Sequence, residues 1–150
     1  MRNSCVEISV CGEKNYRLFL DIIKQELDSI GAVDINAIQA FILMNINDNV
    51  VTIGEVITRG YYIGSNASYN IKKMTMNNYI HQTQSDFDKR AAYLKLTQKG
   101  LNLCNKLYDS VNNYLKIFET SIGGDFDIDQ CIGVMKKIEH FWKDILMRRV

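Results

Sequence analysis

Apolar residues recur at steps of three and four along most of this 150-residue chain, and that spacing predicts helices with one apolar face. The helical runs cover about residues 14–31, 36–46, 53–59, 65–76, 98–122 and 130–148. Gly31 stands where a glycine commonly ends a helix, and Asp34 or Asn36 can cap the second run. Thr52 and Glu55 have the spacing of a capping box at the start of the third.

Two short runs, residues 79–84 and 92–96, lack helical spacing and predict a β-hairpin. Leu94 and Leu96 fall on one side of the second strand, which predicts a buried face there. Thr97 is placed to cap the long helix that follows. The order of a polar helix, a hairpin with a charged tip and a long helix predicts a mainly α fold with a small β-hairpin wing, a winged helix-turn-helix.

The helix predicted over residues 65–76 has a core side and a polar side. Ala67, Ile71 and Met74 stand at i, i+4 and i+7, so we expect them to face the core. The outward positions are Ser65, Asn66, Ser68, Tyr69, Asn70, Lys72 and Lys73. Amides, hydroxyls and ammonium groups on one helix face suit the base edges and phosphates of a DNA major groove. A solvated face is the alternative, but such a face usually carries glutamate and this one carries none.

Charge is distributed unevenly along the chain, although the net charge is only +1. Residues 1–58 carry a net charge of −4 and residues 107–150 carry −1. Residues 59–106 carry 8 basic and 2 acidic side chains, a net charge of +6. A localised basic face is the electrostatic footprint of nucleic-acid binding, while a solvated basic surface is the alternative that charge alone leaves open.

The first helix and the last two extend beyond a compact winged helix, and each has an apolar side that must be buried. A second copy of the chain is the economical partner for these faces, so we expect a homodimer. Residues 1–13 have some strand character but no clear partner strand, and we expect an irregular arm there.

Several classes of protein are excluded by what the chain lacks. No run approaches the roughly 18 apolar residues of a membrane helix, and the N-terminus lacks the apolar region of an export signal. We therefore expect a cytoplasmic protein with no membrane partner. The cysteines and histidines are Cys5, Cys11, Cys104, Cys131, His81 and His140. No cysteine pair has CxxC spacing and the histidines are far apart, so we expect no metal site, no disulfide framework and no cofactor.

An enzyme is the first rival class. Cys131 with His140 is the only nucleophile and base that could be paired, and no third orienting group or glycine-rich phosphate loop accompanies them. We therefore expect no catalytic activity.

The wing region carries the most specific motif. Asp88-Lys89-Arg90 is followed by Tyr93-Leu94-Lys95-Leu96-Thr97-Gln98-Lys99-Gly100. Together they resemble the wing of the MarR family of bacterial transcription regulators, an Asp-x-Arg tip and a strand ending in Leu-Thr-x-x-Gly. Residues 59–70 also resemble the LdtR-like branch of alphaproteobacteria. The order of the helices extends the resemblance over about residues 14–148.

The resemblance implies a single MarR-type domain over residues 1–150. Residues 14–31 and 101–148 would form dimerisation helices, and residues 34–100 the winged-helix DNA-binding lobe. It implies that Arg90 enters the minor groove and that Asp88 holds Arg90 in position.

Two winged helices in a dimer would bind double-stranded DNA at a pseudo-palindromic operator, each with residues 65–76 in the major groove and the wing, residues 79–96, in the minor groove. The residues expected to contact phosphates are Lys72, Lys73, Lys89, Lys95 and Lys99.

The sequence leaves two modes of regulation open. In one, a small-molecule effector binds between the dimer region and the DNA-binding lobe, with candidate pocket residues Tyr16, Tyr61, Tyr62 and Tyr108. In the other, oxidation of Cys5 or Cys11 makes the protein a redox-sensing regulator of the same fold. A protein-interaction module that has lost operator binding is the second rival class, against which the +6 charge of residues 59–106 argues.

Overall fold

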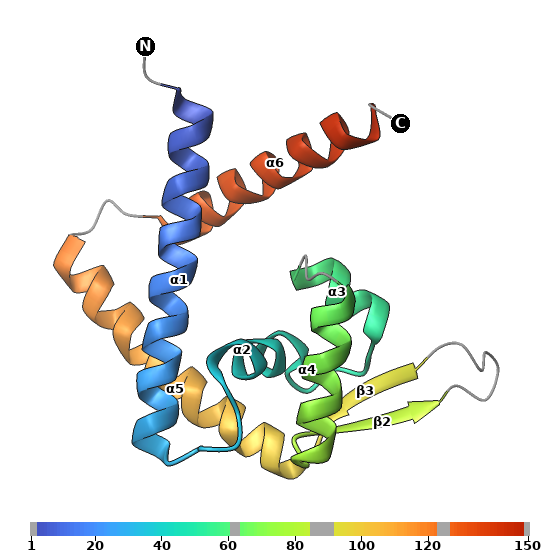
Figure 1. The fold of residues 1–150 in the computed structure, drawn as a ribbon. Coiled ribbons are helices and arrows are strands. Elements are labelled where there is room, and N and C mark those ends of the chain that lie inside the picture. The colour runs from blue at the N-terminus through green and yellow to red at the C-terminus, as the bar shows by residue number, and fades with distance from the viewer. Residues whose placement is uncertain (1–2, 61–63, 85–91, 123–126, 149–150) are drawn as a thin grey trace. The chain divides into compact units, whose positions relative to one another are not determined.

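The computed structural model describes residues 3–60, 64–84, 92–122 and 127–148. The chain divides into two compact units, Met1–Val111 and Asn112–Val150. The first contains the elements from α1 to the start of α5, and the second contains the end of α5 and α6 (Figure 1). The elements are α1 (Ser4–Ile30), α2 (Ala37–Ile46), β1 (Val51–Thr52), α3 (Ile53–Gly60), α4 (Gly64–Met76), β2 (Ile80–Gln84), β3 (Ala92–Leu96), α5 (Gln98–Ile122) and α6 (Ile128–Met147).

Helix α1 begins ten residues before the predicted start, so the expectation of an irregular arm was wrong for residues 4–13. Asn3 caps the helix, and its side-chain oxygen accepts a hydrogen bond from the Val6 amide at 3.3 Å. An extended arm without a partner strand would leave its backbone groups unpaired, whereas a helix pairs them internally. The predicted end is confirmed: Gly31 has φ +78°, and its amide donates to the Asp28 carbonyl at 3.2 Å.

Two predicted caps are confirmed in the connections that follow. Asn36, and not Asp34, caps α2: its side chain accepts from the Gln39 amide at 2.9 Å, and the Gln39 side chain accepts from the Asn36 amide at 3.2 Å. The Thr52 hydroxyl accepts from the Glu55 amide at 3.1 Å, and the Glu55 carboxylate accepts from the Thr52 amide at 2.6 Å. These reciprocal bonds begin α2 and α3 where the sequence places them.

The three strands form an antiparallel sheet in the order β1-β3-β2. Strand β1 was not predicted, because its two residues form a strand only through pairing with β3, where Val51 lies opposite Leu94. The predicted hairpin is confirmed, with Ile80 opposite Leu96 at its base. Leu94 and Leu96 are buried and Tyr93 is exposed, which confirms the predicted sidedness.

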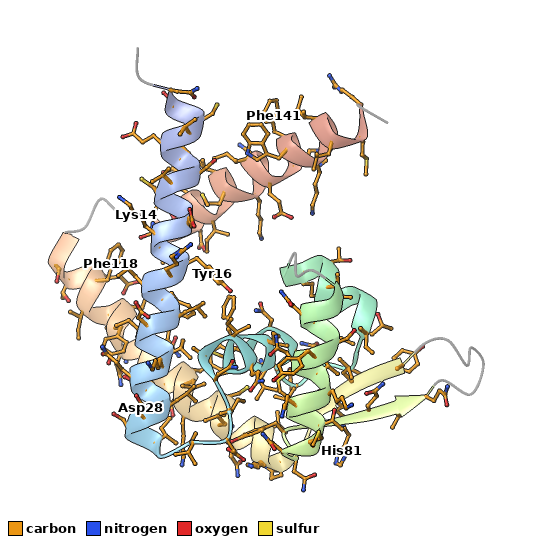
Figure 2. All side chains as sticks on the ribbon, viewed as in Figure 1. Lys14, Tyr16, Asp28, His81, Phe118 and Phe141 are labelled. Atoms are coloured by element: carbon orange, nitrogen blue, oxygen red, sulfur yellow. The ribbon has the colours of Figure 1, made fainter. Side chains whose placement is uncertain are left out.

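The core of the first unit lies where the second half of α1, α2, α4, the sheet and the start of α5 meet. Its fully buried side chains include Ile23, Leu43, Ile46, Leu94 and Leu107. An aromatic cluster joins α1 to α2, with the ring centroids of Tyr16 and Phe19 5.9 Å and 5.5 Å from that of Phe41. Figure 2 shows Tyr16 on the side of α1 that faces α2.

The second unit contains a helix, α6, that has no buried residue. The exposed apolar side chains of α6 are Ile132, Val134, Met135, Phe141, Trp142, Leu146 and Met147. The ring centroids of Phe141 and Trp142 lie 5.2 Å apart, and Figure 2 labels Phe141 on the helix. Among the residues described, no helix has the length and hydropathy needed to span a bilayer.

Candidate nucleic-acid interface

Helix α4 is anchored by one face and open on the other. Ala67, Ile71 and Met74 are all almost completely buried, as their spacing predicted. The residues Asn66, Ser68, Tyr69, Lys72 and Lys73 are exposed, and the Ser65 side chain lies outside what the structure describes. Because the apolar face fixes the rotation of the helix, it also fixes which side chains an approaching ligand meets.

Asn70 differs from the other outward positions, because its side chain is half-buried and engaged inside the protein. Its amide nitrogen donates to the Asn66 carbonyl at 2.9 Å, and its amide oxygen accepts from the Gln39 side chain at 3.2 Å. Gln39 is itself buried and belongs to the capping box of α2. Asn70 therefore holds α4 in register with α2, and its contact with DNA stays a prediction.

The basic groups of α4 stand near its C-terminal end. The Lys73 ammonium lies 6.0 Å from the centroid of the Tyr69 ring, a cation–π arrangement at the edge of the usual range. Positive charge at this end of a helix is stabilised by the helix dipole. The exposed face of α4 therefore combines two ammonium groups, an aromatic ring and neutral hydrogen-bonding groups.

The wing consists of β2 and β3, and Figure 1 shows both strands beside α4. Lys95 is exposed on β3 opposite His81 of β2, which Figure 2 labels. The predicted tip residues Asp88, Lys89 and Arg90 lie outside the described residues. Their roles in DNA binding therefore stay predictions.

The motif Leu-Thr-x-x-Gly has a structural explanation at the base of the wing. The Thr97 hydroxyl donates to the Asn78 carbonyl at 2.6 Å and accepts from the Gly100 amide at 3.1 Å, which confirms Thr97 as the cap of α5. The Thr97 amide donates to the Tyr79 carbonyl at 3.0 Å. A Cβ atom on Gly100 would lie 2.3 Å from the Tyr79 carbonyl oxygen, so only glycine permits this close approach.

A polar network that was not predicted from the sequence joins three segments beside the Leu-Thr-x-x-Gly motif. The Tyr79 hydroxyl donates to the Asp34 carboxylate at 2.5 Å, and the Lys99 ammonium lies 2.7 Å from the other carboxylate oxygen. The Lys99 ammonium also donates to the Asn77 carbonyl at 2.9 Å and lies 4.1 Å from the Tyr79 ring centroid. Lys99, which we expected to contact phosphate, is thus held on Asp34.

The network changes the titration of its members in opposite directions. Hydrogen bonds from Lys99 and then from Tyr79 hold the pKa of Asp34 below its usual value. Burial, followed by the hydrogen bond to Asp34, raises the pKa of Tyr79 well above its usual value. At neutral pH Asp34 is therefore ionised and Tyr79 is a neutral phenol, and the network joins the α1–α2 connection to the start of α5.

The candidate effector residues are largely used for packing. Tyr16 packs against Phe41, and the Tyr108 hydroxyl donates to the Met44 carbonyl at 2.5 Å. Tyr61 and Tyr62 lie outside the described residues. A cavity of about 520 Å³ lies instead beside the polar network, with Ile30, Leu103 and Lys106 in its lining.

The cysteines fall into two classes. Cys104 is completely buried, and burial raises the pKa of its thiol to about 12, so it is a poor nucleophile in the folded protein. Cys5, Cys11 and Cys131 are exposed. In the part of the chain that the structure describes, no three His, Cys, Asp or Glu side chains gather where a metal ion could bind.

Comparison with known proteins gives matches to part of the chain and to most of its length. Residues 35–100 match the family of winged helix DNA-binding domains, the segment from the cap of α2 to the motif glycine of α5. The Exopolysaccharide II synthesis transcriptional activator ExpG of Rhizobium meliloti (strain 1021) is 29% identical over 136 residues, which span 91% of this chain and 70% of that protein. The matched segment contains both α4 and the wing.

Solved structures extend this similarity over the whole chain. AbsC, a MarR family transcriptional regulator from Streptomyces coelicolor, has a TM-score of 0.73 at 16% identity, covering 96% of this chain and 97% of AbsC. A point mutant of MarR from E. coli, complexed with operator DNA, has a TM-score of 0.69 at 16% identity, covering 91% and 96% of the two chains. These likenesses confirm the predicted fold: the chain is a winged helix-turn-helix arranged as in solved MarR family regulators.

Proposed function

We propose that this protein is a dimeric, sequence-specific regulator that binds an operator with α4 in the major groove and the wing in the adjacent minor groove. The observation that carries the proposal is the division of α4. Its apolar face is buried on α2 and the sheet, and its outer face leaves Ser68, Tyr69, Lys72 and Lys73 exposed. Exposed donors and acceptors on a rigidly held helix are what base recognition requires.

The exposed apolar surface of the terminal helices supports a homodimer. Phe141 on α6 is 52% exposed, Leu18 on α1 is 61% exposed, and Ile117 on α5 is 61% exposed. Helices that expose several large apolar side chains are typical of oligomer interfaces. A two-fold dimer presents two copies of α4, so its operator is a pseudo-palindrome with half-sites about one helical turn, roughly 34 Å, apart.

Two relatives support the choice of ligand and process. The E. coli MarR mutant was solved with operator DNA, and ExpG is a transcriptional activator. A bacterial regulator that binds genomic DNA acts in the cytoplasm, and the net charge of +6 over residues 59–106 draws the DNA-binding lobe to phosphates.

The experiment that tests the proposal is selection of genomic DNA fragments by the purified full-length protein, followed by gel-shift titration of the enriched sequence. We expect a pseudo-palindromic sequence and one dimer per site. Arg90→Ala should weaken binding without changing the thermal unfolding temperature, whereas Lys136→Ala on α6 should leave the affinity unchanged. Enrichment of no sequence over the input, at low salt and with a dimeric sample, contradicts the proposal.

A further inference from the structure

A groove lies between α4, the proposed recognition helix, and strand β2 of the wing. It has a volume of about 440 Å³. Its polar donors are Ser68 and Lys72 on α4 and Gln82 on β2, above apolar residues that include Ile53 and Met76. Among its described lining residues none is acidic. The groove therefore presents hydrogen-bond donors and positive charge with no competing carboxylate.

Gln82 reaches this groove because of its register in the sheet. It lies opposite Leu94 of β3, and cross-strand partners point to the same face of a sheet. Leu94 is completely buried in the core, so Gln82 points to the core side of the sheet, where β2 contacts α4. Gln82 itself is exposed, since it lies farther along the hairpin than the buried Ile80.

Both polar side chains at the mouth of the groove are available to a ligand. Within the described parts of the chain, the side chains of Lys72 and Gln82 have no hydrogen-bond or ion-pair partner. Thr75, by contrast, donates its hydroxyl to the Ile71 carbonyl at 2.8 Å and is not available as a donor. An unpaired ammonium and an unpaired amide that face one groove form a site for an anionic oxygen.

The geometry of B-DNA identifies the anion. The major groove is about 12 Å wide and the minor groove about 6 Å wide, and a single sugar–phosphate strand separates them. If α4 occupies the major groove and the wing occupies the neighbouring minor groove, that strand must pass between α4 and β2. We infer that the groove holds this backbone, with Lys72 and Gln82 on opposite walls donating to one phosphate. The inference rests on the proposed function and adds Gln82 as a positioning residue.

Replacing Lys72 and replacing Gln82 should affect DNA binding differently, because one donor is charged and the other is neutral. Lys72→Ala should reduce the slope of log affinity against log salt concentration by about one, since one counterion fewer is released. Gln82→Ala should weaken binding roughly tenfold, as expected for loss of a hydrogen bond to a charged group, with an unchanged salt slope. Because phosphates carry no base information, the loss should be equal for the selected duplex and for single-base variants of it.

The test measures fluorescence-anisotropy affinities for a duplex that the wild-type protein selects from random-sequence DNA. Thr83→Ala is the matched control, because Thr83 is an exposed neighbour on the opposite face of β2, paired with Tyr93. Replacing single phosphates by uncharged methylphosphonates locates the contact. One replacement should weaken the wild-type protein and should weaken Gln82→Ala by a smaller factor, because only Lys72 still donates to that phosphate in the variant.

The outcomes separate the proposed function from this inference. Selection of no duplex by the wild-type protein overturns both the proposed function and this inference. Selection by the wild type with unchanged affinity for Gln82→Ala, or an equal loss for Thr83→Ala, overturns the inference alone. So does a Gln82→Ala variant whose loss depends on the base sequence, since the side chain then reads a base. Equal thermal unfolding temperatures for all variants are required for these comparisons.

Discussion

Replacement of Gly100 by alanine should destabilise the protein, although alanine ordinarily stabilises a helix. Gly100 lies in the first turn of α5, where a Cβ atom would lie 2.3 Å from the Tyr79 carbonyl oxygen and 3.2 Å from Leu96 Cγ. Ordinary contact begins at 3.4 Å, so the Tyr79 carbonyl and the helix must separate by about 1 Å. The neighbour is backbone, which cannot rotate away as a side chain can.

The separation has a cost that can be estimated from the bonds at the site. The Tyr79 carbonyl accepts from the Thr97 amide at 3.0 Å, and a shift of about 1 Å breaks such a bond. Loss of a hydrogen bond in a part-buried site costs roughly 1–3 kcal/mol, and overpacking costs roughly 1–3 kcal/mol more. The helix preference of alanine offsets only about 1 kcal/mol. The net destabilisation is therefore about 1–5 kcal/mol.

Thermal unfolding followed by circular dichroism measures this effect at one fixed protein concentration. A change of about 1–5 kcal/mol should lower the unfolding temperature by roughly 2–20 °C for a chain of this size. Gly54→Ala is the matched control, because Gly54 lies in the first turn of α3 and its nearest neighbour would be the Thr52 hydroxyl at 3.8 Å. It should be neutral or stabilising by up to about 1 kcal/mol. A Gly100→Ala protein as stable as the wild type would refute the argument.

Three further predictions follow from the structure. Because the folded-state pKa of Asp34 is lowered, its contribution is present above its unfolded pKa near 3.8 and is lost as pH falls below it. Asp34→Asn should therefore reduce the difference in unfolding free energy between pH 6 and pH 3 by less than about 1 kcal/mol, since the carboxylate is 41% exposed; an unchanged difference contradicts the ion pair. A thiol reagent should modify three of the four cysteines rapidly and Cys104 only after unfolding, and mass spectrometry that finds native Cys104 modified at the same rate excludes its burial. In the proposed homodimer, Phe141→Asp should raise the dissociation constant at least tenfold in sedimentation velocity, as roughly 1.5–3 kcal/mol of apolar burial is lost, whereas Tyr69→Asp should not. Equal dissociation constants for the two variants would show that α6 lies outside the interface.

Part of the candidate site was predictable because its signals are local. The face of α4 follows from Ala67, Ile71 and Met74, whose spacing alone places them on one side of a helix. The caps Asn36, Thr52 and Thr97 each act on a residue three positions later, so a short window of sequence contains both partners. Gly100 of the wing motif and the buried side of β3 were likewise predicted from residues that are close together in the sequence.

The errors at the N-terminus and at β1 have one physical cause. Val6, Ile8 and Val10 alternate as strand residues do, but a strand needs a partner, and these residues lie in α1 instead. Val51 and Thr52 are too few to show a pattern and become a strand because β3 lies beside them. In both cases the outcome depends on whether a second strand is present, which a local pattern does not contain.

By itself the sequence determined the order of the helices and of the two hairpin strands from α2 to α6, the buried face of α4, the basic segment and the wing motif. Only the tertiary structure decided that Asn70 is tied to Gln39, 31 residues away, and that Lys99 is held by Asp34, 65 residues away. It also brought Gln82 across from Lys72 to form one groove. Helix periods and caps join residues within four positions of each other, so the chain encodes them locally. Contacts between distant residues exist only after the core has fixed the positions of the elements that carry them.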